Sequence, residues 1–117
     1  MNFNLSQIPE RKSKPRRSGI TMVMDKGLSI EETKNFLSVA HPYIDIVKLG
    51  FGTSFVTPQL REKIKVYQSY DLPLYFGGTL FEAFLIRNQF QDYVNTLKDY
   101  NISYMEVSDG SITIPHA

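Results

Sequence analysis

Four apolar runs alternate with polar, helix-type stretches along the chain, at residues 20–24, 44–49, 73–76 and 102–107. Their length and their β-branched and aromatic content predict strands buried on both faces. The second run ends unusually, in Lys48 and then GFGTS at residues 50–54. Glycines there let the backbone turn or pass close to a ligand. A cation beside them is costly to bury unless an anion meets it.

Helical periodicity fills the three intervals between these runs, at residues 29–41, 57–71 and 80–100. Ser29 and Glu32 have the spacing of a capping box, which predicts where the first helix begins. Thr57 and Pro58 suit the cap and first turn of the second helix. The third helix is expected to be interrupted around residues 87–89.

This strand–helix alternation predicts an α/β fold with a parallel sheet, because strand starts roughly 24 to 30 residues apart suit right-handed crossovers. The first strand is followed by Asp25-Lys26-Gly27 rather than by a GxGxxG motif, which argues against a dinucleotide-binding fold. A flavodoxin-like sheet and part of a (βα)8 barrel both remain open.

The carboxyl ends of parallel strands meet at one edge of the sheet, so the polar residues there are expected to converge. Side-chain alternation predicts that the inward positions are Asp25, Lys48, Gly77 and Glu106, with Val23, Ile46, Tyr75 and Tyr104 one layer below. The outward positions are then Met22, Met24, Val47, Leu49, Leu74, Phe76, Met105 and Val107. A slip of one residue would put a charge under a helix.

The converging side chains predict a Mg²⁺-assisted site for a small polyanion. Asp25 and Glu106 offer carboxylates to the metal, and Lys26 and Lys48 offer charge to an anion. The residues expected to line the substrate site are Gly50, Gly52, Thr53, Ser54, Gly77, Gly78, Thr79, Ser108 and Asp109. The alternative is a structural ion network of Asp25, Lys48 and Glu106 inside a barrel.

Composition narrows the function classes. The chain has 117 residues, 42% of them hydrophobic and 21% charged, which suits one folded domain. A net charge of +1 gives no reason to expect a nucleic-acid or membrane partner. The lack of cysteine excludes disulfides and thiolate metal sites, and with no apolar leader at the amino end we expect a cytoplasmic protein.

The first 18 residues form an irregular, basic lead-in. Its basic cluster comprises Arg11, Lys12, Lys14, Arg16 and Arg17. Without interleaved aromatic residues, we expect this cluster to be a solvated arm rather than an anion-binding or nucleic-acid patch.

The same strand-end residues lie in segments that resemble the phosphosulfolactate synthase family. The segments are KPRRSGITMVMDKGL (14–28), PYIDIVKLGFGTS (42–54), YFGGTLFEAF (75–84) and MEVSDGSI (105–112). The resemblance implies a TIM (β/α)8 barrel, of which residues 19–117 would form a (βα)4 half. It also implies Mg²⁺-dependent addition of sulfite to phosphoenolpyruvate, giving (2R)-phospho-3-sulfolactate. In methanogens this step begins coenzyme M biosynthesis.

By this resemblance, Asp25 and Glu106 would hold the metal, and Lys26 and Lys48 would balance the two anionic substrates. The family's general acid is a lysine after the fifth strand, beyond this chain, so we expect the isolated chain to lack synthase activity. The chain is expected to be a truncated fragment missing its carboxyl-terminal half, or a half-barrel that forms a homo-oligomer. The alternatives are a non-catalytic relative of the heat-stress-associated type and an inactive truncated product.

Overall fold

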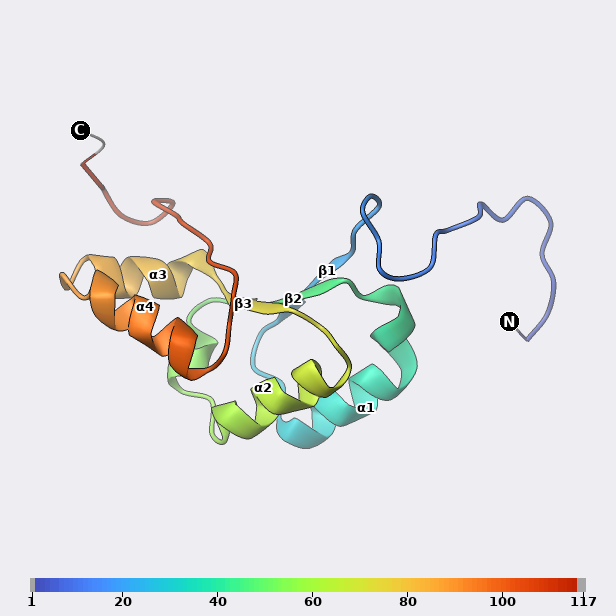
Figure 1. Cartoon of the computed structure of the whole chain (residues 1–117), viewed down its shortest axis with the longest axis horizontal. Coiled ribbons are helices and arrows are strands. Elements are labelled where there is room, and N and C mark those ends of the chain that lie inside the picture. The colour runs from blue at the N-terminus through green and yellow to red at the C-terminus, as the bar shows by residue number, and fades with distance from the viewer. Residues whose placement is uncertain (1, 116–117) are drawn as a thin grey trace.

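The computed structural model describes residues 2–115 and contains one parallel sheet with helices beside it (Figure 1). The strands are β1 (Met22–Asp25), β2 (Ile46–Leu49) and β3 (Leu74–Phe76). The α-helices are α1 (Ile30–Ala40), α2 (Leu60–Ser69), α3 (Gly78–Leu85) and α4 (Phe90–Asp99), and the two 3₁₀ turns are η1 (His41–Tyr43) and η2 (Thr53–Phe55). The predicted α/β class with a parallel sheet is confirmed.

The strands lie side by side in chain order, β1-β2-β3, and both pairs are parallel. Sequential neighbours are typical of a (βα)8 barrel, whereas a flavodoxin-like sheet places its first strand between the second and third. The observed order therefore favours the barrel alternative.

The start of α1 is as predicted, and the start of α2 is not. The Ser29 hydroxyl accepts a hydrogen bond from the amide of Glu32, and the Glu32 carboxylate accepts one from the amide of Ser29. In contrast, α2 begins only at Leu60, after Gln59 with a φ of 54°. The Thr57 hydroxyl donates to the carbonyl of Thr53 at 2.7 Å instead of capping the helix. The expected start at Thr57 and Pro58 is therefore wrong.

The expected break in the third helical stretch is confirmed. Helix α3 ends at Leu85 and α4 begins at Phe90, with Asn88 between them at a φ of 57°. The first of the two helices starts at Gly78, two residues before the expected Leu80.

The predicted fourth strand is wrong, because residues 102–107 form no ladder with β3. Strand β3 has only three residues, and a strand placed beside it would present an unpaired edge of its own. Met105 and Val107, which were expected to be covered by helices, are instead exposed, and so is Tyr104.

Helices α1 and α2 lie on one side of the sheet (Figure 1). On β2 and β3, the predicted alternation is confirmed, since Val47, Leu49, Leu74 and Phe76 are buried under the helices. Their neighbours Ile46, Lys48 and Tyr75 are only partly buried and belong to the opposite face, called the open face below.

The alternation predicted for β1 is wrong by one residue. Asp25 pairs with Leu49, and Met24 pairs with Lys48. Directly opposed residues share a face, so Asp25 and Val23 point toward the helices, whereas Met22 and Met24 lie on the open face. The expected cost of a charge under a helix is offset, because Lys63 meets the Asp25 carboxylate there.

The basic lead-in is largely exposed, as expected of a solvated arm, but three of its cations contact the rest of the chain. Arg16 pairs with Asp45 at 2.8 Å, and Lys14 donates to the carbonyl of His41 at 2.6 Å. Arg11 reaches the carbonyl of Tyr43 at 3.3 Å. Positive charges near the last carbonyls of α1 stabilise the helix, because its carboxyl end carries the negative end of the helix dipole. Within residues 2–115, no helix has the length and apolar character needed to cross a membrane.

Candidate functional site

An ion pair between Lys48 and Glu106 lies at the carboxyl edge of the sheet. The ammonium nitrogen is 3.1 Å from each carboxylate oxygen, and the side chains are 19% and 32% exposed. Lys48 projects from the open face of β2, and Glu106 reaches it from the irregular segment after α4. Their predicted convergence is confirmed, and their chemical roles stay predictions.

Two glycines at the start of α3 allow this segment to approach closely. The amide of Gly78 donates to Glu106 Oε1 at 2.8 Å. A Cβ atom on Gly78 would lie 2.4 Å from the Cβ of Ser108 and 2.7 Å from Glu106 Oε1. A Cβ on Gly77 would lie 3.1 Å from Lys48 Cε. Any larger residue at position 78 would displace the segment that carries Glu106.

A polar cavity of about 110 Å³ surrounds the Lys48–Glu106 pair. Its lining includes six residues predicted for the site, namely Lys48, Gly77, Gly78, Thr79, Glu106 and Ser108. It also includes Met24, Phe51, Glu82 and Ser111. One cation, two carboxylates and several hydroxyl groups thus face this small polar space.

Glu82 was missed by the sequence analysis. It is 3% exposed, and its Oε1 accepts hydrogen bonds from the amide of Ser111 at 2.9 Å and the hydroxyl of Ser108 at 3.3 Å. Its signal in the sequence is a single carboxylate in the apolar run LFEAFL at residues 80–85. A carboxylate in such a run requires either polar partners or a ligand.

Lys26 does not line the cavity but contacts Phe51, which does, and this position is called the rim below. Its ammonium group is 5.4 Å from the ring centroid of Phe51, and Phe51 lines the cavity. This distance is within the range of a cation–π contact. Lys26 thus places positive charge beside Phe51, one of the residues that line the cavity with Lys48.

The loop after β2 shapes the entrance and does not line the cavity beyond Phe51. The Thr53 hydroxyl donates to the carbonyl of Gly50 at 2.8 Å, and Gly52 has a φ of 70°. The Ser54 hydroxyl is buried and finds no hydrogen-bond partner within residues 2–115. Gly50, Gly52, Thr53 and Ser54, which were predicted to line the substrate site, are not among the residues that line this cavity.

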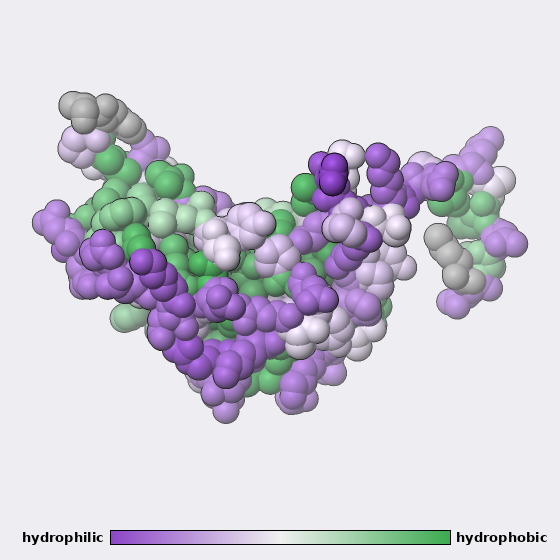
Figure 2. Space-filling view, in the orientation of Figure 1, coloured by the Kyte–Doolittle hydropathy of each residue, from purple (hydrophilic) through white to green (hydrophobic). Residues whose placement is uncertain are grey.

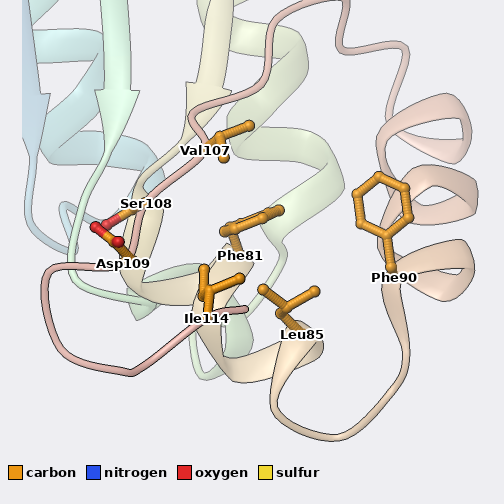
Figure 3. A pocket seen from close by; sticks show the side chains of 7 residues that line it. All are labelled: Phe81, Leu85, Phe90, Val107, Ser108, Asp109 and Ile114. Carbon is orange, nitrogen blue, oxygen red and sulfur yellow. The ribbon is translucent and has the colours of Figure 1, made fainter. Parts of the chain in front are cut away.

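Asp109 lies in a neighbouring pocket of about 480 Å³ between α3 and the carboxyl-terminal segment (Figure 3). Figure 3 shows Ile114 beside Phe81 and Leu85. Figure 2 shows hydrophobic residues gathered at this end of the molecule. Apolar walls do not suit a small anion, and Asp109 is not among the residues that line the cavity around Lys48, although its neighbour Ser108 lines both spaces.

Asp25 lies on the other face of the sheet, sealed under α2. Its Oδ2 is 2.8 Å from Lys63 Nζ and accepts a hydrogen bond from the Tyr67 hydroxyl at 2.7 Å. Its Oδ1 accepts from the amides of Gly27 and Leu28 at 2.8 and 2.9 Å. Burial alone would raise the pKa of Asp25, but these hydrogen bonds together outweigh it and hold the pKa below its ordinary value.

The carboxylates differ in how well they suit Mg²⁺. Within residues 2–115, no group of three or more histidine, cysteine or acidic side chains could hold a metal ion. The oxygens of Asp25 already meet a cation and three further donors, so this side chain does not fit a metal. Glu82 and Glu106 line the cavity and supply oxygens of the kind Mg²⁺ prefers, which fits an ion that draws its other ligands from water and substrate.

The sequence is similar to that of a known protein family. A family model described as (2R)-phospho-3-sulfolactate synthase (ComA) matches residues 9–117. A phosphosulfolactate synthase of Bacillus subtilis (strain 168) is 34% identical over 112 residues, covering 96% of this chain and 44% of the relative. One from Methanothermobacter thermautotrophicus is 33% identical over 108 residues, covering 91% and 42%. One from Methanocaldococcus jannaschii is 39% identical over 98 residues, covering 82% and 39%. The chain spans less than half the length of these curated relatives.

Proposed function

Because the chain belongs to the (2R)-phospho-3-sulfolactate synthase family, we propose that it forms part of a site that adds sulfite to phosphoenolpyruvate. In this reaction the sulfur of sulfite bonds to C3, the electrons of the C2–C3 double bond move toward the carboxylate, and C2 takes a proton. The product is (2R)-phospho-3-sulfolactate. Both substrates are anions, so a site that brings them together must supply positive charge.

The observation that carries this proposal is Lys48 in a small polar cavity at the carboxyl edge of a parallel sheet. The side chain is only 19% exposed, so its attraction for an anion is screened less than that of a surface lysine. Lys48 binds the phosphate or carboxylate of phosphoenolpyruvate, and Lys26 at the rim adds charge for the second anion. Thr79 and Ser108 line the same cavity and offer hydroxyl groups to the substrate.

Mg²⁺ belongs to the same proposal, held by Glu106 together with Glu82. When bound, the ion supplies positive charge where negative charge develops on the substrate carboxylate. Glu106 also keeps Lys48 oriented toward the cavity through their ion pair. Asp25 takes no part in metal binding in this scheme, because its oxygens are already engaged.

Completion of a TIM barrel is also part of the proposal. The relatives are more than twice as long as the part matched here, and Met22 on the open face is 44% exposed. A closed barrel would cover this face and pair the outer edges of β1 and β3. We expect polypeptide equivalent to the rest of the relatives to be needed for turnover.

The proposal is tested by titrating the chain with phosphoenolpyruvate in MgCl₂ and following the heat of binding. Lys48→Met should weaken binding at least about tenfold, the size expected for losing one charged hydrogen bond. Lys34→Met is the matched control, because Lys34 is 54% exposed on α1 and should leave binding unchanged. Failure of the unmodified chain to bind, or equal binding by Lys48→Met, would contradict the proposal.

A second measurement tests the need for further polypeptide. The chain is incubated with phosphoenolpyruvate, sulfite and Mg²⁺, and phosphorus NMR follows the appearance of phosphosulfolactate. We expect substrate binding without product. Product formed by the chain alone would show that the barrel need not be completed for the reaction.

A further inference from the structure

We propose that Asp25, Lys63 and Tyr67 form a buried positioning group that fixes Lys26 at the rim of the cavity. The three side chains are at most 2% exposed. None of them reaches the cavity, so their contribution to anion binding is indirect. The proposal rests on the proposed function only for the identity of the anion that Lys26 meets.

Helix α2 supplies the two side chains that contact Oδ2 of the Asp25 carboxylate. Lys63 and Tyr67 are four residues apart and therefore lie on the same face of the helix. The ammonium group and the hydroxyl both meet Asp25 Oδ2, at 2.8 and 2.7 Å. This oxygen anchors the carboxylate to α2.

The other carboxylate oxygen holds the turn that carries Lys26. Asp25 Oδ1 accepts from the amides of both Gly27 and Leu28, the two residues directly after Lys26. Gly27 has a φ of 116°, a backbone conformation that residues other than glycine rarely adopt. The turn is thus fixed by the carboxylate and by a glycine together.

The turn is also tied to the entrance of the cavity. The carbonyl of Asp25 accepts a hydrogen bond from the amide of Gly50 at 2.8 Å, which joins the end of β1 to the loop after β2. Lys26 then stacks over Phe51 of that loop, and Phe51 lines the cavity. A series of contacts therefore leads from α2 through Asp25 to Lys26 and to Phe51 at the cavity.

Two double variants separate this positioning role from simple stability. Asp25→Asn with Lys63→Met removes both charges but keeps an Oδ1 acceptor for the turn. Asp25→Leu with Lys63→Met removes the charges and the acceptor. Replacing a buried ion pair by neutral groups of similar volume is often tolerated, so both proteins are expected to fold, as checked by circular dichroism.

Amide hydrogen exchange measured by NMR reports the turn directly. The amides of Gly27 and Leu28 should exchange at least about tenfold faster in the leucine variant than in the asparagine variant, because only the latter can hold them. Equal exchange in the two proteins would overturn the proposal. This readout needs no ligand, so it decides the question even if phosphoenolpyruvate does not bind.

Coupling to Lys26 is tested with phosphoenolpyruvate in MgCl₂. Lys26→Ala should weaken binding about tenfold in the asparagine background and less than twofold in the leucine background, where Lys26 is already released. Equal loss in both backgrounds would show that Asp25 does not position Lys26. Absence of binding by the unmodified chain would instead contradict the proposed function.

Discussion

The two ion pairs near the carboxyl edge of the sheet lie in opposite environments. Asp25 and Lys63 meet under α2 at 2.8 Å, with side chains 1% and 2% exposed. Lys48 and Glu106 meet on the open face at 3.1 Å, with side chains 19% and 32% exposed. The first pair is sealed by protein on every side, and the second borders a cavity.

The difference teaches that a carboxylate at a strand end is not by itself a site residue. Both oxygens of Asp25 are fully used by partners from α2 and from the following turn. Among residues 2–115, Glu106 meets Lys48 and the amide of Gly78, and its Oε2 contacts Lys48 alone, so this oxygen retains room for a ligand. Availability, rather than position at the strand end, distinguishes the two carboxylates.

The largest effect is expected from breaking the sealed pair. Lys63→Ala leaves the Asp25 carboxylate buried without its cation and should lower the free energy of unfolding by about 3 to 5 kcal/mol. Urea unfolding followed by circular dichroism measures this loss. Lys65→Ala is the control, since Lys65 is exposed on the same helix and should change stability by less than about 0.5 kcal/mol. A loss below about 1 kcal/mol for Lys63→Ala would contradict the sealed-pair description.

Acid should weaken the sealed pair in a defined direction. Burial raises the pKa of Asp25, but the hydrogen bonds from Lys63, Leu28, Tyr67 and Gly27 hold the net pKa below its ordinary value. Because the folded-state pKa is depressed, this stabilisation is present above the unfolded pKa of about 3.9 and is lost as pH falls through the lower folded value.

The measurement for this acid effect is the free energy of unfolding between about pH 5 and pH 2. The double variant Asp25→Asn with Lys63→Met serves as the reference, because it lacks this titration. The unmodified chain should lose stability faster than the reference as pH falls. Parallel curves for the two proteins would mean that the pair contributes no pH dependence.

The sequence was sufficient for most of the fold because the relevant signals are local. The Ser29–Glu32 capping box and the alternation on β2 and β3 depend on near neighbours, and both are confirmed. The prediction of a fourth strand was wrong because residues 102–107 have strand-type composition but pair with no strand among the described residues. A strand is fixed by partners as well as by propensity.

The candidate site was predicted only in part, because some of its signals are local and others depend on distant residues. Lys48 and the glycines at residues 77–78 were found because they interrupt an apolar strand pattern. Asp25 was given the wrong orientation because its compensating cation, Lys63, is 38 residues away on a helix, where a lysine is ordinarily exposed. No local pattern reveals such a partner, although Lys63 and Tyr67 do share a helix face with the apolar Leu60 and Ile64.

The open pair should contribute far less to stability than the sealed one. A double-mutant cycle of Lys48→Met and Glu106→Gln should give a coupling free energy of about 0.2 to 1 kcal/mol, because both side chains are partly solvated. The salt dependence is a second readout, since added NaCl should reduce this coupling. A coupling above about 3 kcal/mol, the size expected of a buried pair, would remove the contrast between the two regions.

The smallest effect is expected at Tyr93, which is buried like Tyr67. The Tyr67 hydroxyl donates to Asp25, whereas the Tyr93 hydroxyl has no hydrogen-bond partner within residues 2–115. Tyr93→Phe should therefore leave stability at neutral pH unchanged to within about 0.5 kcal/mol, whereas Tyr67→Phe should cost about 1 to 3 kcal/mol.

Above the ordinary tyrosine pKa near 10, the stabilities of the two variants should differ further. Burial, and then the charge of Glu106, raises the pKa of Tyr93 to about 12, so its neutral form stabilises the fold below pH 10 and this contribution is lost as pH rises toward 12. Tyr93→Phe should remove that part of the alkaline loss, as measured by unfolding at pH 8 and pH 11. A Tyr93→Phe variant as unstable as Tyr67→Phe at neutral pH would show that the Tyr93 hydroxyl has a partner in solution.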